Sequence, residues 1–242
     1  MSNKLSYYED GNKVADRAVI ESVQSDDKGH FILLDHTIFY PQGGGQFLDQ
    51  GQLQLGDSTI PILSVRMVDG EVRHYTDQDY SYAVGQKVSC SLNQEKRLLH
   101  SKLHTSGHLI SNVLESHYQS YKAVKGHHFP GECFVEFSAN NGSPAEIDVD
   151  LLKREINALI SQDQPVLSIF VTEAQFRAAC PDTPYAIPTT QTQSMRLVKI
   201  GSFSYQPCGG MHVMTTSQLR GLEITKVKTK NTSMKVYYSI KE

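Results

Sequence analysis

The sequence has few cysteines and no long apolar run, and each absence excludes a class of protein. Only four of the 242 residues are cysteine, and no two of them form a Cys-x-x-Cys pair. A disulfide-stapled scaffold is therefore excluded, and reduced thiols are indicated. No run of about 18 apolar residues is present, which excludes a helical membrane span. The first residues also lack the apolar segment of a secretory signal. We therefore expect a cytoplasmic protein with no membrane partner.

The chain also lacks a strong excess of charge. Its net charge is -3 and its pI is about 6.4, so the overall charge does not indicate a nucleic-acid-binding protein. A local basic face can still hold a phosphate backbone. The apolar content of 39% and the length of 242 residues are ordinary for a globular chain of one large domain or two modest ones.

The residue pattern changes character near residue 90. Residues 13–90 carry short runs rich in Val, Ile, Phe and Tyr, separated by turn signals, which predict a small β-barrel or sandwich. Beyond them, helical periodicity predicts helices over 93–118, from a cap at Asp150 to 162, and from Thr172 or Glu173 to Cys180. Strands are predicted at 134–139, 165–174, 195–203 and 221–240, and the proline-rich stretch 180–188 is predicted to be a loop. We therefore predict an α+β fold with domains 1–90 and 91–242, the second with helices on a mostly antiparallel sheet.

Two pairs of residues have the spacing of metal ligands. His104 and His108 are four apart on the predicted long helix, which places both imidazoles on one face. Cys208 and His212 are also four apart, with two glycines between them that let the backbone turn tightly. Each pair alone has an ordinary reading, as surface histidines or a core cysteine. Together they offer the thiolate and imidazole donors of a tetrahedral zinc site.

The histidine pair lacks the acid of a metalloprotease. That motif needs a glutamate directly after the first histidine, and Thr105 occupies the position here. Proton transfer would then depend on zinc-bound water or on a nearby group such as the hydroxyl of Thr105. The second close histidine pair, His127 and His128, predicts a strand with one ring inward and the other outward.

A third feature is the segment FYPQGGGQ at residues 39–46. It lacks both the Gly-Lys-Ser/Thr ending of a phosphate loop and the G-x-G-x-x-G pattern of a dinucleotide fold. One interpretation is a hairpin turn. The other is a backbone brought close to a ligand or a neighbouring domain, as three consecutive glycines would allow. In that case the amide of Gln46 could bind a substrate.

These three motifs together resemble the alanyl-tRNA editing family, the AlaX proteins related to the editing domain of alanyl-tRNA synthetase. The resemblance is carried by FYPQGGGQ, by HTSGHLI at 104–110 and by PCGGMHV at 207–213, with similar pieces at 125–137 and 198–210. It covers nearly the whole chain and matches the medium-length form. It implies a translation-factor-like β-barrel followed by an editing domain shared with threonyl-tRNA synthetase. The implied reaction is hydrolysis of mischarged aminoacyl-tRNA(Ala), chiefly Ser-tRNA(Ala) and also Gly-tRNA(Ala), and the implied partner is the acceptor end of tRNA(Ala).

The resemblance also assigns roles to individual residues. It implies Zn²⁺ as the cofactor, with the metal ligands His104, His108, Cys208 and His212. It implies substrate binding by Gly43, Gly44, Gly45, Gln46 and Thr105. The sequence departs from the family at Met211, where threonine is usual, and at Val124, where the synthetase domain carries glutamine.

Several alternatives stay open from the sequence. Four protein ligands describe a closed zinc site, so catalysis would need one loose ligand, for which His212 is the candidate, a fifth coordination position, or a water that attacks independently of zinc. A binding module with a structural zinc and no deacylase activity is one competing interpretation, and a zinc hydrolase of another aminoacyl ester is a second. Lysines near the C-terminus and near residue 125 indicate either a solvated strand face or contact with tRNA. They are Lys122, Lys125, Lys226, Lys228, Lys230, Lys235 and Lys241.

Overall fold

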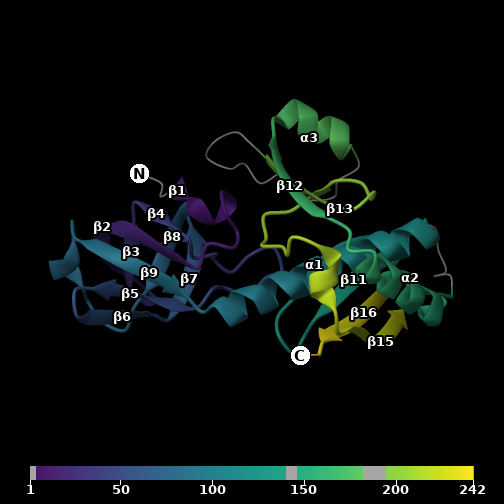
Figure 1. Ribbon diagram of the computed structural model, residues 1–242, viewed down its shortest axis with the longest axis horizontal. Coiled ribbons are helices and arrows are strands. Elements are labelled where there is room, and N and C mark those ends of the chain that lie inside the picture. Colours follow the sequence, from purple (N-terminus) through teal and green to yellow (C-terminus); the bar gives the residue numbers. More distant parts are fainter. Residues whose placement is uncertain (1–3, 140–145, 182–194, 242) are drawn as a thin grey trace. The chain divides into compact units, whose positions relative to one another are not determined.

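The computed structural model describes residues 4–139, 146–181 and 195–241 (Figure 1). These residues form an α+β structure with antiparallel sheets and three α-helices. The chain divides into two compact units. The first unit contains Met1–Gly43 and Phe47–Leu99, and the second contains Gly44–Gln46 and His100–Glu242. The predicted α+β class is therefore confirmed, and the glycine-rich segment is split between the two units.

The first unit is built on a seven-stranded antiparallel sheet of order β6-β5-β9-β2-β3-β8-β7. The strands are β2 (Ala15–Asp26), β3 (Gly29–Leu34), β5 (Gly51–Leu55), β6 (Ser58–Ile62), β7 (Ser64–Val68), β8 (Glu71–Tyr75) and β9 (Lys87–Leu92). A short parallel pair, β1 (Lys4–Leu5) and β4 (His36–Thr37), and two 3-10 turns, η1 (Ser6–Tyr8) and η2 (Ser81–Ala83), complete the unit. The sequence pattern missed β5, whose GQLQL run is short and mostly polar.

This sheet does not close into the predicted barrel. The terminal strands β6 and β7 each pair with one strand only among the described residues. The long strand β2 pairs with β9 through Ala15–Val19 and with β3 through Ile20–Asp26, and its register shifts between Ile20 and Ser22. A bulge bends a strand. The sheet thus curves around its apolar core and stays open between β6 and β7.

The second unit contains most of the long helix α1 (Gln94–His117) and two further helices, α2 (Val149–Ser161) and α3 (Glu173–Ala179). One antiparallel sheet has the order β10-β11-β16-β15, and another has the order β12-β13-β14. The strands are β10 (Tyr121–His127), β11 (Phe134–Ala139), β12 (Val166–Val171), β13 (Met195–Ile200), β14 (Gln206–Pro207), β15 (Leu222–Lys230) and β16 (Ser233–Ile240), and the 3-10 turn η3 spans Thr216–Leu219. Within the described residues no helix is long and apolar enough to cross a membrane.

The helix starts follow local capping chemistry. The side chain of Asn93 accepts a hydrogen bond from the Lys96 N–H at 3.0 Å, which fixes the start of α1 where the sequence predicts it. Thr172 caps α3 in a capping box, and the helix begins at Glu173, one of the two predicted starts. The cap of α2 was predicted at Asp150 and lies at Asp148, whose carboxylate accepts from the Leu151 N–H. Asp148 and Asp150 are two positions apart and either could cap a helix, so the pattern alone left its first turn ambiguous. The predicted loop at 180–188 lies mostly in 182–194, outside the described residues.

Candidate metal centre

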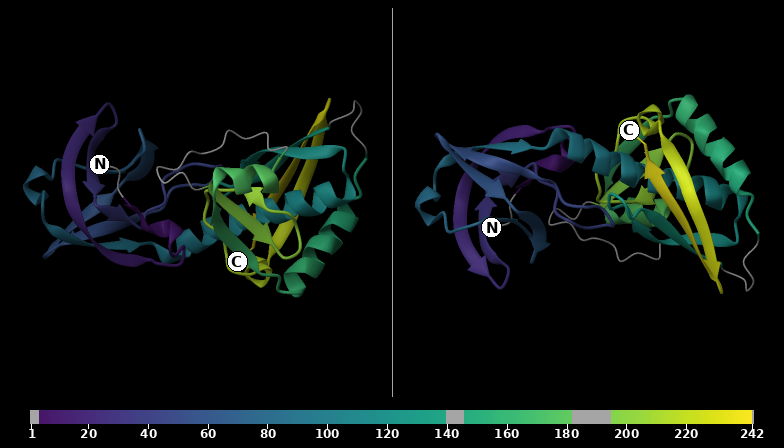
Figure 2. Two further views of the ribbon diagram at one scale, coloured as in Figure 1. Left: turned by 90° about the horizontal axis from the view of Figure 1, so that it is seen from above. Right: turned by 90° about the horizontal axis from the view of Figure 1, so that it is seen from below.

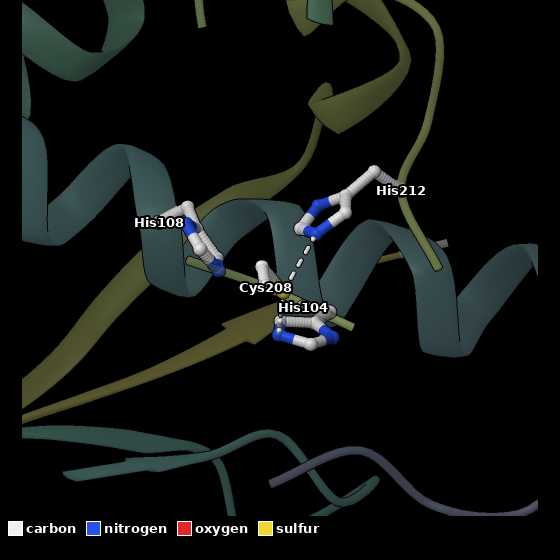
Figure 3. Close-up of side chains that lie close together, drawn as sticks. All are labelled: His104, His108, Cys208 and His212. Atoms are coloured by element: carbon white, nitrogen blue, oxygen red, sulfur yellow. Dashed lines mark hydrogen bonds between the residues drawn. The ribbon is translucent and has the colours of Figure 1, made fainter. Parts of the chain in front are cut away.

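The two predicted ligand pairs come together in the second unit. His104 and His108 project from consecutive turns of α1, while Cys208 and His212 lie on the segment after β14 (Figure 3). Their donor atoms all lie within 4.8 Å of one another. The Sγ atom of Cys208 is 3.4 Å from Nε2 of His104 and 3.2 Å from Nε2 of His212.

The two distances from Cys208 fit the edges of a zinc tetrahedron. Zn–N bonds of about 2.0 Å and Zn–S bonds of about 2.3 Å place neighbouring donors roughly 3.5 Å apart. The donor set of three imidazoles and one thiolate also suits zinc. The residues present therefore fit a zinc ion, as expected from their spacing in the sequence.

Each histidine of the cluster is held through its other ring nitrogen. Nδ1 of His104 lies 2.8 Å from Oε1 of Gln46, and Nδ1 of His108 lies 2.7 Å from Oε1 of Gln206. An amide oxygen only accepts, so both Nδ1 atoms carry the hydrogen and both Nε2 atoms keep a lone pair. Outer partners of this kind fix the tautomer and orientation of a metal-binding imidazole.

Thr105 holds the third histidine, His212, through its Nδ1 atom in the same way. Its hydroxyl donates to the Ser101 carbonyl at 2.8 Å and lies 3.0 Å from Nδ1 of His212. Because its hydrogen is given to Ser101, the oxygen accepts from the imidazole and also from the Val213 N–H at 3.2 Å. The side chain is fully buried. The predicted role of Thr105 in binding substrate stays a prediction, whereas its contact with His212 is a structural fact.

Burial and mutual charge shift the pKa values of all four clustered side chains. Burial lowers the pKa of His104 and of His212 well below the usual range, which keeps both imidazoles neutral. Burial opposes ionisation of Cys208, but the adjacent His104 and His108 outweigh it and lower the thiol pKa well below its usual value. Burial also opposes a charge on His108, but the adjacent Cys208 and Gln206 outweigh it and raise the pKa of this imidazole above its usual value. Zinc binds the thiolate and neutral imidazoles, so binding would displace a proton from His108.

The glycine-rich segment meets this centre through its last two residues. Gly45 has φ +77°, and a Cβ there would lie 2.4 Å from the Gly126 carbonyl oxygen, so only glycine fits. The Gly45 carbonyl accepts from the His128 N–H at 2.8 Å. The side chain of Gln46 is fully buried, and its oxygen bonds both His104 and the Met211 N–H. Gly43 and Gly44 are exposed. The predicted substrate contacts of this segment stay predictions.

Three residues of the centre were not identified from the sequence. Gln206 bonds His108 from two positions before Cys208. The Arg196 guanidinium donates to the carbonyls of Cys208 and Gly210, at 2.9 and 2.7 Å, and so holds the ligand loop. His128 is buried as the inward ring of its pair and stacks on His104 at 4.6 Å between centroids.

Glycine is also required on the loop between the other two ligands. A Cβ at Gly210 would lie 1.9 Å from Cε1 and 2.1 Å from Nδ1 of His104. The loop backbone therefore lies directly against this ring. Of the two departures from the expected family pattern, Met211 is buried and Val124 is exposed at the bulge of β10.

Comparisons with known proteins cover both units. Residues 4–96 match the family model described as tRNA synthetases class II (A), and residues 195–235 match the second additional domain of threonyl and alanyl tRNA synthetases. The chain is 29% identical over 232 residues to the alanyl-tRNA editing protein AlaX-M of Methanosarcina barkeri, covering 91% of each. It is 28% identical to the AlaX-M protein of Methanosarcina acetivorans, again over 91% of each.

A second group of relatives is much longer. The alanine–tRNA ligase of Halorubrum lacusprofundi is 28% identical over 224 residues, which cover 92% of this chain and 24% of the ligase. The chain thus spans about a quarter of that ligase and about nine-tenths of the shorter relatives.

Proposed function

Because this chain belongs to the AlaX type of alanyl-tRNA editing proteins, we propose that it hydrolyses mischarged aminoacyl-tRNA(Ala) as a free-standing proofreading factor. The near end-to-end match to AlaX-M proteins supports this proposal. Its main support in the structure is the metal-competent cluster of His104, His108, Cys208 and His212, of which Cys208 and His212 lie within the domain shared with the synthetases.

The substrates follow from the limits of amino-acid selection. A pocket shaped for alanine discriminates poorly against an added hydroxyl, and it cannot exclude the smaller glycine by size. Ser-tRNA(Ala) is therefore the chief proposed substrate and Gly-tRNA(Ala) the second. The bond broken is the ester between the amino acid and the 3′-terminal ribose. Water supplies the hydroxyl to the acyl carbon, and the ribose oxygen leaves with a proton.

The chain's own residues prepare the site for this reaction. His104, His108, Cys208 and His212 would hold zinc, which supplies Lewis acidity when bound. Gln46, Gln206 and Thr105 each accept the Nδ1–H of one histidine and so aim the three Nε2 atoms inward. Arg196 anchors the loop that carries Cys208. We infer that Thr105 acts on the reaction through His212, because its hydroxyl is buried and already bonded to protein groups.

The test is deacylation with and without metal. Purified protein is incubated with Ser-, Gly- and Ala-tRNA(Ala), after treatment with a chelator and after zinc is restored. The proposal expects release of serine, slower release of glycine, and little release of alanine, with activity lost on chelation and recovered with zinc. If no ester is released faster than in buffer, the enzyme proposal fails, and selective loss of Ala-tRNA(Ala) would contradict proofreading.

One observation favours a second candidate function. Four protein donors within 4.8 Å can fill a tetrahedron completely, which is typical of a structural zinc. The second candidate is therefore a tRNA- or protein-binding module without deacylase activity. It predicts that chelation lowers the stability of the chain, while no aminoacyl ester is hydrolysed at any zinc concentration.

A further inference from the structure

The four-stranded sheet of the second unit has two chemically different faces. On β11 and β16 every second side chain is buried: Val135, Phe137, Met234, Val236 and Tyr238. Tyr238 on this inner face bonds the Leu103 carbonyl of α1. The alternate residues form the opposite face, which we call the outer face. β15 and β16 run side by side along it (Figure 2).

The strand register orders the outer face into rows. One row crosses the four strands as His127, Phe134, Tyr237 and Lys226. The next row is Lys125, Glu136, Lys235 and Lys228, and the third is Lys122, Ser138, Ser233 and Lys230. The outer face thus carries an aromatic row beside two rows rich in lysine, with Glu136 as the one acidic residue in the three rows.

The aromatic row is continuous from strand to strand. The rings of His127 and Phe134 stack at 5.3 Å between centroids, and those of Phe134 and Tyr237 lie 5.7 Å apart. The ammonium of Lys235 lies 4.5 Å from the Phe134 centroid, and that of Lys228 lies 5.8 Å from the Tyr237 centroid. All three rings are partly exposed. Cation and ring therefore alternate over a surface open to solvent.

The lysine arrangement is unfavourable for the isolated sheet. Lys228 is directly opposite Lys235, and like charges at such a cross-strand position are destabilising. The pKa of Lys226 is lowered, chiefly by the neighbouring charge of Lys228. Lysines on edge strands prevent association of sheet edges. That role explains lysines on the edge strands β10 and β15. Lys235 lies on the interior strand β16, where its ammonium is 3.4 Å from the carboxylate of Glu136 and is partly neutralised by it.

We propose that the outer face binds the RNA of the aminoacyl-tRNA, with the lysines contacting phosphates and the aromatic row stacking on an unpaired base. This inference rests on the proposed function and deepens it by naming the docking surface. Lysine contacts to phosphates supply RNA affinity, and an aromatic sheet surface stacks bases. An acidic peptide would use the lysines but leave the aromatic row unexplained. Because α1 lies against the inner face, substitutions on the outer face should change the affinity for tRNA and leave hydrolysis of the ester unchanged.

The charge contribution is tested with uncharged tRNA(Ala) bound to the zinc-loaded chain over a range of salt concentrations. The double variant Lys228→Gln/Lys235→Gln should bind more weakly. The slope of log K against log salt should become shallower by about 0.9 for each phosphate that the variant no longer neutralises. Lys153→Gln on the exposed side of α2 is the matched control and should bind as the unmodified chain does. Unchanged affinity and slope in the double variant would overturn the proposal.

The aromatic contribution needs a separate variant. Tyr237→Leu should weaken tRNA binding about fivefold or more because it removes a stacking surface, with no change of salt slope. Tyr237→Phe keeps the ring and should bind normally. Equal binding by Tyr237→Leu and Tyr237→Phe would contradict base stacking, and circular dichroism melts confirm that each variant is folded.

A short substrate separates this inference from the proposed function. The lysine double variant should hydrolyse a seryl ester of a terminal adenosine at the unmodified rate, while its KM for Ser-tRNA(Ala) rises. If both substrates are hydrolysed normally with unchanged KM, the docking surface is wrong and the function stands. If the unmodified chain hydrolyses neither ester, the function fails, and the binding measurements with uncharged tRNA still decide the docking surface.

Discussion

The side-chain oxygen of Gln46 lies 2.8 Å from Nδ1 of His104, although the two residues are 58 positions apart in the sequence. The same oxygen accepts the Met211 N–H at 2.8 Å. A single buried amide thus ties the glycine-rich segment to a ligand on α1 and to the ligand loop. This relationship makes the metal centre depend on a residue that contributes no ligand atom.

Loss of the Gln46 acceptor should weaken metal binding. Gln46→Ala leaves Nδ1 of His104 without its partner, and removing an outer partner of this kind lowers metal affinity about 10- to 100-fold. Zinc affinity is measured by competition with a chromophoric chelator. Gln46→Glu keeps an acceptor and should retain most of the affinity, and Gln42→Ala, in the same segment but exposed, is the control. Equal affinities for the alanine variants at 46 and 42 would refute this role.

Removal of a proposed ligand should abolish stoichiometric zinc binding. Cys208→Ala and His104→Ala each remove a donor from the cluster, so metal analysis after dialysis should show far less than one zinc per chain. Cys180→Ala removes a free, partly exposed thiol that lies outside the cluster and should keep its zinc. Full zinc content in the Cys208→Ala variant would mean that the ligand set is wrong.

The hydroxyl of Tyr238 should stabilise the second unit. It donates to the Leu103 carbonyl at 3.0 Å and receives the Nδ1–H of His128, a hydrogen bond within the buried core. Tyr238→Phe leaves a buried imidazole donor unpaired, which costs roughly 1–3 kcal/mol. Urea unfolding measures the destabilisation, and Tyr237→Phe on the outer face is the matched control. Identical unfolding midpoints for the two variants would count against this arrangement.

Acid should destabilise the first unit through His74. This fully buried ring donates from Nδ1 to the Ile32 carbonyl at 3.0 Å and accepts at Nε2 from the Thr37 hydroxyl at 2.8 Å. Burial lowers its pKa to about 4, whereas an unfolded histidine titrates near 6.5. Between these two pKa values the unfolded chain binds a proton at His74, whereas the folded chain does not. The contribution of neutral His74 to the free energy of unfolding is fully present above about pH 6.5, and about 3 kcal/mol of it is lost as the pH falls to about 4.

The measurement is the free energy of unfolding at several pH values for the unmodified chain and for His74→Gln. Taking the difference between the two chains removes contributions from the metal centre, which both share. The variant should be less stable at pH 7, and its difference in free energy of unfolding from the unmodified chain should become smaller toward pH 4. A gap that stays constant over this range would show that His74 does not titrate as proposed.

Local spacing in the sequence was enough to identify the four clustered residues. His104 and His108 share a face because an α-helix repeats every 3.6 residues, and the structure confirms that helix over Gln94–His117. The paired glycines after Cys208 likewise predicted a tight loop, and Gly210 proves indispensable beside the His104 ring. The start of α3 was predicted at Thr172 or Glu173, and it lies there because helix capping is an interaction within one turn.

Features that depend on distant contacts were decided only by the tertiary structure. Short runs rich in Val, Ile, Phe and Tyr predicted strands in the first unit, and a small β-barrel or sandwich was expected. Strand pairing instead left the sheet open between β6 and β7. Gln206 reaches His108 across 98 positions, and no local pattern marks such a pair. The sequence of residues 221–242 shows which positions carry lysine, but it does not show which residues lie beside them in the sheet. Only strand register placed Lys228 opposite Lys235 and beside the aromatic row, because pairing partners are chosen by packing across the whole sheet.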